Sequence, residues 1–137
     1  MFPISIPVML YVRFNGSIPV EKTKGDLFQA LKEVVKELKN GDKVWIFPEG
    51  GITKDGNIRQ GKRGVVFLHQ QTGAPIVPVA LIGTFKILSL STLFRKNKVE
   101  VRIGKSIYAL ENCTKGNCNL ENGVAKVMSE ITRLMQN

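Results

Sequence analysis

The stretch VWIFPEGG, residues 44–51, is a short apolar run that ends abruptly in turn-forming residues. The run contains Trp45 and has the length and composition of a buried strand, which we expect to be central in its sheet and parallel to its neighbours. Pro48 fixes its own φ, and the two glycines allow backbone conformations that other residues rarely adopt. The stretch therefore predicts a strand that ends in a tight turn carrying one carboxylate, that of Glu49.

Helical and extended patterns alternate on both sides of this turn. Apolar residues at helical spacing predict helices at residues 23–39, 61–72 and 120–135, and apolar runs or alternations predict strands at 8–14, 76–82 and 99–103. Asn40-Gly41 and Gly73 should end the first two helices, and residues 111–119 form a polar loop. This alternation predicts a single α/β domain over residues 1–137, with a mainly parallel sheet flanked by helices. Ligands of such sheets bind beyond the carboxyl ends of strands, where the turn of Glu49 falls.

The amino-acid composition favours certain classes of binding partner but does not decide among them. The 137 residues are 43% hydrophobic and carry 20 Lys and Arg against 11 Asp and Glu, a net charge of +9. This excess favours nucleic acid, an anionic bilayer surface or phosphorylated small molecules. Two apolar stretches, residues 1–11 and 80–94, are too short or too interrupted to span a membrane. We therefore expect the protein to touch a membrane without crossing it.

A basic cluster follows the turn by about ten residues. Arg59, Lys62 and Arg63 stand beside glycines at the predicted start of a helix, where backbone N–H groups and cations together can bind an anion. The alternative is a solvated basic face. Glu49 has two interpretations as well: it could accept hydrogen bonds from a substrate hydroxyl, or it could cap a turn through nearby backbone N–H groups.

Four short blocks, weak singly but specific in order and spacing, resemble those of the 1-acylglycerol-3-phosphate acyltransferase family. They cover about residues 2–104 of the chain and are G-S-I-P-V-E-K at 16–22, F-P-E-G at 47–50, G-K-R-G at 61–64 and I-V-P-V-A at 76–80. The resemblance implies acyl transfer from acyl-CoA or acyl-carrier protein to the hydroxyl of a lysophospholipid, in phospholipid biosynthesis. It also implies that Lys22, Glu49 and Gly50 bind the glycerol-phosphate of the acceptor, with Lys62 and Arg63 as helpers.

The chain departs from the family pattern in three places. In the family, an H-x-x-x-x-D block supplies the general base that takes a proton from the acceptor hydroxyl. The single histidine here is His69, which lies in a predicted helix with Ala74 where the aspartate would stand. Lys22 stands where arginine is commoner. A lysine keeps the charge but cannot bind phosphate in the bidentate geometry of arginine. Gly51-Ile52 replaces the small hydroxyl and basic residues often found after F-P-E-G, a change that bears on acceptor preference.

Several expectations follow from these departures. We expect the chain to begin partway into the domain and to be inactive as it stands, with no catalytic residue of its own. We expect no cofactor and no metal, because Cys113 and Cys118 lack further ligands nearby. The protein is expected at the cytoplasmic face of a membrane as a peripheral protein.

Two alternatives stay open. One is a non-catalytic module that binds lipid or an anionic membrane surface. The other is a nucleic-acid binder, which charge alone supports, since no aromatic residues interleave with the basic ones. We therefore expect no nucleic-acid partner.

Overall fold

The computed structural model describes residues 14, 16–18, 27–51, 53, 55–85, 98–110, 113–114 and 117–136. The chain divides into two compact units, Met1–Val44 and Trp45–Asn137. The expectation of one domain over all 137 residues stays a prediction.

The first unit contains helix α2, Leu27–Lys39. Leu31, Val34 and Val35 are buried along one stripe of this helix, as the helical spacing of its apolar residues predicted. Beyond the helix, Gly41 has a φ of 92°, a left-handed conformation that ends it as expected. The predicted first turn at residues 23–26 and residues 8–13 of the predicted strand lie outside the described residues. Phe14, the one described residue of that strand, is helical, so the strand prediction is wrong at this position.

The second unit is built around helices α3, Gly64–Thr72, and α5, Leu120–Gln136. Both were predicted, although α3 begins three residues later than its pattern indicated. Asn119 accepts hydrogen bonds from the backbone N–H groups of Glu121 and Asn122 and so begins α5. Gly73 ends α3 with a φ of 70°, and its N–H donates to the carbonyl of His69.

The core of this unit lies where α3 meets α5. Val66 is fully buried, and a side chain at Gly123 would place its Cβ only 2.8 Å from Val66 Cγ1. The glycine therefore lets the two helices approach closely. The buried members of this core are Val65, Val66, Leu110, Val124 and Val127.

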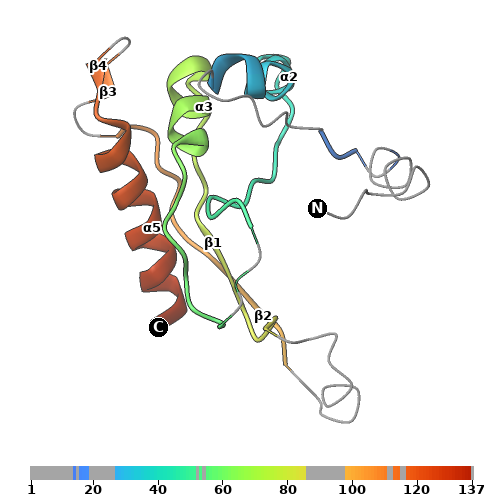
Figure 1. The fold of residues 1–137 in the computed structure, drawn as a ribbon, viewed down its shortest axis with the longest axis vertical. Coiled ribbons are helices and arrows are strands. Elements are labelled where there is room, and N and C mark those ends of the chain that lie inside the picture. The colour runs from blue at the N-terminus through green and yellow to red at the C-terminus, as the bar shows by residue number, and fades with distance from the viewer. Residues whose placement is uncertain are drawn as a thin grey trace. The chain divides into compact units, whose positions relative to one another are not determined.

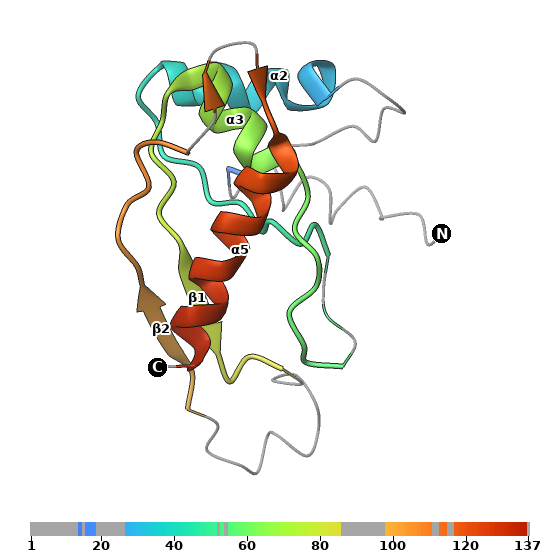
Figure 2. The ribbon, with the colours of Figure 1, turned by 90° about the vertical axis from the view of Figure 1, so that its left-hand side faces the viewer.

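Two strands, β1 (Val79–Ile82) and β2 (Glu100–Ile103), pair antiparallel, with Val79 opposite Ile103 and Leu81 opposite Val101. Helix α5 packs along this pair and runs beside it in both views of the ribbon (Figures 1 and 2). The fold is thus of the α/β type. The predicted parallel pairing is not found among the described strands, because an apolar pattern marks a strand without specifying its partner or its direction.

The two faces of the β1–β2 pair differ in an unexpected way. Ala80 is buried, and Arg102 on the same face donates a hydrogen bond of 2.9 Å from Nη1 to the carbonyl of Leu134 in α5. The opposite face carries Val101 and Ile103, which are 54% and 70% exposed. The charged side of β2 therefore faces the helix, because a guanidinium suits the carbonyl-rich C-terminal end of α5. The apolar side faces outward.

Residues 44–47 do not form the predicted buried strand. They have no strand assignment, and Trp45 and Phe47 are 59% and 61% exposed. A strand needs a neighbour for its N–H and C=O groups, and no described segment is paired with this one in a sheet. An apolar run is not necessarily buried, because burial depends on partner segments that composition does not specify.

Residues 76–82 and 111–119 differ in smaller ways from their predicted structures. The predicted strand at 76–82 is shorter, since Pro78 leaves only a bridge between Ile76 and Ile107 before β1 begins. Within the predicted polar loop, β3 (Cys113–Thr114) and β4 (Asn117–Cys118) form a short antiparallel hairpin. No helix in the described part of the chain is both long and apolar enough to span a bilayer.

Candidate functional site

The F-P-E-G block forms a tight turn. The N–H of Gly50 donates a hydrogen bond of 3.0 Å to the carbonyl of Phe47, which closes a four-residue turn with Pro48 in its second position. Proline is favoured there because its fixed φ matches the turn. Gly50 has a φ of 64°, a conformation that glycine adopts without the steric cost that a Cβ brings.

Two hydrogen bonds join this turn to the basic segment that follows it. The backbone N–H of Arg59 donates to Glu49 Oε2 over 2.7 Å. The backbone N–H of Lys62 donates to the carbonyl of Pro48, also over 2.7 Å. The Glu49 carboxylate thus binds a backbone donor ten residues away in the sequence, and the two segments are held side by side.

The side chains of the basic segment lie over the glycines of the turn. A Cβ built on Gly50 would stand 2.7 Å from Lys62 Nζ, and one built on Gly51 would stand 3.2 Å from Arg59 Nη1. An ammonium and a guanidinium therefore lie close to two consecutive glycines. Because glycine has no side chain, a ligand can approach the backbone here while it contacts both cations.

The loop between the turn and the basic segment is held by its own hydrogen bonds. Asp55 accepts from the Thr53 hydroxyl at 2.8 Å and from the side-chain amide of Asn57 at 3.0 Å. These bonds, the one from Asn57 first, lower the pKa of the Asp55 carboxyl from 3.8 to about 2. The carboxylate is therefore ionised at neutral pH, and the hydrogen bonds it accepts order the loop that brings Arg59 back to the turn.

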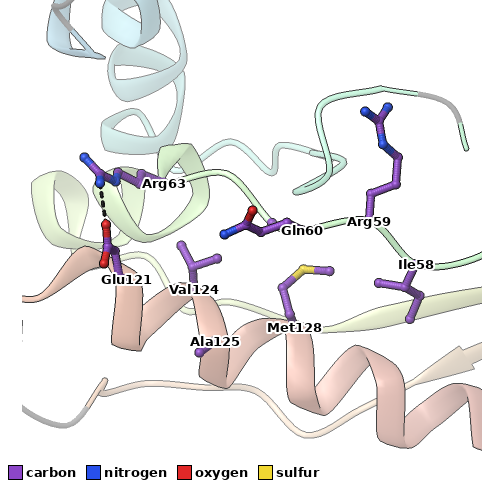
Figure 3. A pocket seen from close by; sticks show the side chains of 9 residues that line it. Ile58, Arg59, Gln60, Arg63, Glu121, Val124, Ala125 and Met128 are labelled. Atoms are coloured by element: carbon purple, nitrogen blue, oxygen red, sulfur yellow. Dashed lines mark hydrogen bonds and ion pairs between the residues drawn. The ribbon is translucent and has the colours of Figure 1, made fainter.

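Arg63 points in a different direction from Lys62. Its Nη2 lies 2.5 Å from Glu121 Oε1, in an exposed ion pair that joins the residue before α3 to the first turn of α5 (Figure 3). This pair stands beside an open groove of about 510 Å³ along α5. Arg59 extends away from α5 in the same view, so its guanidinium lies on the other side of the backbone from Val124 and Met128 (Figure 3).

The predicted acceptor-binding residues thus fall into three groups. The structure brings together Glu49, Gly50 and Lys62. Arg63 is engaged by Glu121 instead, and Lys22 lies outside the described residues. Ligand binding by all five stays a prediction. The sequence predicted Arg59 in the basic cluster but not among the acceptor-binding residues. No local pattern shows that Arg59 lies beside Glu49; the hydrogen bond between them does.

His69 lies in α3, as predicted, and its ring forms a hydrogen bond just beyond the C-terminal end of the helix. Its Nδ1 is 2.7 Å from the carbonyl oxygen of Ala74. A carbonyl can only accept, so Nδ1 carries the proton and donates to Ala74. The imidazole thus helps to tie the residues after α3 to the helix, which is a structural use of the side chain.

Comparisons with known proteins agree with the sequence blocks. The Acyltransferase family profile matches residues 4–82, more than half of the chain, so the chain belongs to this family. No solved structure matches it significantly.

Three curated relatives show the range of organisms that carry similar sequences. The chloroplastic 1-acyl-sn-glycerol-3-phosphate acyltransferase of Brassica napus is 38% identical over 107 residues, which is 75% of this chain and 31% of that protein. The alpha form of the Homo sapiens enzyme of the same name is 38% identical over 61 residues, 44% of this chain and 22% of that protein. The Bacillus subtilis enzyme is 37% identical over 79 residues, 58% of this chain and 37% of that protein. The chain thus spans less than half the length of each relative.

Proposed function

We propose that this chain forms the acceptor-binding part of an enzyme that transfers an acyl group to the hydroxyl of 1-acylglycerol-3-phosphate. The observation that carries the proposal is the turn of residues 47–50, with Lys62 against Gly50 and the Glu49 carboxylate beside it. The names of the relatives support this acceptor. The acyl donor would be acyl-CoA or acyl-carrier protein, as the family resemblance implies, in phospholipid biosynthesis.

Each residue of the turn has a distinct role in this proposal. Lys62 binds the acceptor phosphate as a point charge, and Gly50 leaves room for it. A carboxylate has about four lone-pair sites, so Glu49 can hold the Arg59 N–H and still accept a hydrogen bond from the acceptor hydroxyl. Lys22 would add a further cation, and Arg63 would join once Glu121 releases it.

The family's usual proton acceptor, the histidine of the H-x-x-x-x-D block, is missing from these 137 residues. The attacking hydroxyl must lose its proton to a general base, and the sequence has no H-x-x-x-x-D block to supply one. We therefore propose that the chain binds acceptor but does not turn it over by itself. A form that carries the histidine block would release thiol from acyl-CoA in the presence of lysophosphatidate.

A binding titration tests the acceptor site directly. We expect the chain to bind glycerol 3-phosphate more tightly than inorganic phosphate, because only the former offers hydroxyls to Glu49. Lys62→Gln should weaken both ligands by about tenfold or more, the effect of losing one charge-assisted contact. Glu49→Gln should weaken glycerol 3-phosphate selectively.

Matched controls exist for both substitutions. Glu130→Gln and Lys105→Gln remove the same charges at sites remote from the turn in sequence, and neither should change either affinity. Equal affinity of the parent chain and Lys62→Gln for glycerol 3-phosphate would refute the acceptor site. The same pair of variants in a form with the histidine block, followed by thiol release, extends the test to turnover.

We also propose contact with an anionic membrane surface, as a peripheral protein at its cytoplasmic face. The net charge of +9 and the exposed apolar face of β2 support this contact. The same features favour the second candidate function, a non-catalytic lipid-binding module.

Residues 44–47 are proposed to join a mainly parallel sheet when more of an acyltransferase domain is present. Exposed Trp45 and Phe47 support this placement, because large apolar side chains are usually covered in a folded domain.

A further inference from the structure

The geometry points to Arg59 as a phosphate-binding residue that makes the site select phosphomonoesters over phosphodiesters. This inference rests on the proposed function and goes beyond it by assigning a residue and a ligand charge. It depends on two cations, Arg59 and Lys62, that approach the same short stretch of glycine backbone from neighbouring positions.

The backbone of Arg59 fixes where its side chain begins. Its N–H donates to Glu49 Oε2 at 2.7 Å, so the Cα of Arg59 stands beside the turn whatever side chain it carries. Lys62 is fixed in the same way by the 2.7 Å bond from its N–H to the carbonyl of Pro48. Both cationic side chains therefore start from positions that the backbone determines.

Both side chains then reach the glycine pair. Arg59 Nη1 lies 3.2 Å from the position of a Cβ on Gly51, and Lys62 Nζ lies 2.7 Å from that on Gly50. Arg59 is one of the residues that line the groove along α5, and its side chain extends away from that helix (Figure 3). The guanidinium and the ammonium thus lie over two consecutive glycines, Gly51 and Gly50.

Two cations favour the more highly charged phosphomonoester over a phosphodiester, although the Glu49 carboxylate at the same turn offsets part of their charge. A phosphomonoester carries a charge of about −1.5 to −2 at pH 7, since its second pKa is about 6. A phosphodiester carries a single negative charge and has two terminal oxygens, one fewer than a phosphomonoester. A guanidinium binds two phosphate oxygens at once, whereas an ammonium acts as a point charge. With Lys62 beside one charge of the ligand, Arg59 supplies the second cation, and a ligand with a second negative charge should gain most from it.

The test compares methyl phosphate with dimethyl phosphate, two small ligands that differ in this charge. At pH 7.5 the 137-residue chain should prefer methyl phosphate. Arg59→Gln should weaken methyl phosphate on the order of tenfold and dimethyl phosphate much less, so that the preference falls. Arg59→Lys should retain part of the preference, because it keeps the charge and loses the fork.

The variants keep the fold of the turn, since the Arg59 N–H belongs to the backbone and remains in each of them. Their unfolding midpoints in urea should match that of the parent chain. Arg133→Gln, an exposed arginine of α5 paired with Glu130, is the matched control and should leave both affinities unchanged.

The outcomes separate the two proposals. If the parent chain binds glycerol 3-phosphate and Arg59→Gln binds methyl phosphate as tightly as the parent, the role of Arg59 is overturned while the acceptor site stands. If the parent chain binds neither glycerol 3-phosphate nor methyl phosphate, the proposed acceptor site is wrong, and so is the role of Arg59.

Discussion

Gly50 illustrates how one residue meets two demands at the site. Its φ of 64° favours glycine, and its open side is occupied by the Lys62 side chain. The sequence predicted that a glycine here would permit an unusual backbone and close approach of a ligand. Lys62 is the nearest group because its N–H bonds to the Pro48 carbonyl, fourteen residues earlier in the chain, and no local pattern encodes that contact.

Gly50→Ala should destabilise the chain and displace Lys62. A left-handed conformation costs a non-glycine residue about 1–2 kcal/mol, and the new Cβ would stand 2.7 Å from Lys62 atoms. We expect the free energy of unfolding in urea to fall by about that amount, together with weaker binding of glycerol 3-phosphate. Gly51→Ala is the control, because a Cβ there meets only the end of the Arg59 side chain, and its stability should change little. Equal losses for the two variants would show that backbone conformation is not the cause.

At the scale of elements, the three helices of the described chain were predictable because each carries its own signals. Apolar spacing marked α2, α3 and α5, and Gly41 and Gly73 marked two of their ends. The strands were less predictable. The alternation in β2 indicated a half-exposed strand but not which side would be covered, and Arg102 bonding to α5 decided that.

Gly123→Ala tests the close packing of α3 on α5. Alanine favours a helix over glycine by about 1 kcal/mol, but the added methyl would lie 2.8 Å from a Val66 side chain that is fully buried. Overpacking of this kind costs about 1–3 kcal/mol, so we expect a net loss of about 1 kcal/mol in thermal or urea unfolding. Asn122→Ala, at an exposed neighbouring position in α5, should stabilise slightly through propensity alone. A gain for Gly123→Ala would mean that the helices are not in close contact.

For the whole molecule, the net charge and the exposed apolar side chains indicate what the protein contacts more than how it folds. The chain carries +9, and Val101, Ile103, Trp45 and Phe47 are all more than half exposed. Val101 and Ile103 share one face of β2, and an exposed apolar face can contact another protein or a membrane. Composition predicted an anionic partner, and the structure adds where apolar contact is available.

Vesicle sedimentation tests the membrane contact. We expect the chain to sediment with vesicles rich in phosphatidylglycerol, to do so less at high salt, and to leave neutral phosphatidylcholine vesicles unbound. Ile103→Glu should reduce binding severalfold more than Ser106→Glu, although both add one negative charge at an exposed position. Equal reductions would assign the binding to charge alone, and salt-independent binding to both vesicle types would contradict the proposed electrostatic contact.

The helices, the tight turn at Glu49, the basic cluster and the family resemblance are all readable from local spacing and short blocks in the sequence. The packing of distant segments places Arg59 and Lys62 at the turn, pairs Arg63 with Glu121, and leaves residues 45–47 exposed. The reason is physical: backbone conformation and amphipathicity are encoded over a few residues, whereas the partner of a hydrogen bond or a strand is chosen by the packing of segments distant in the chain.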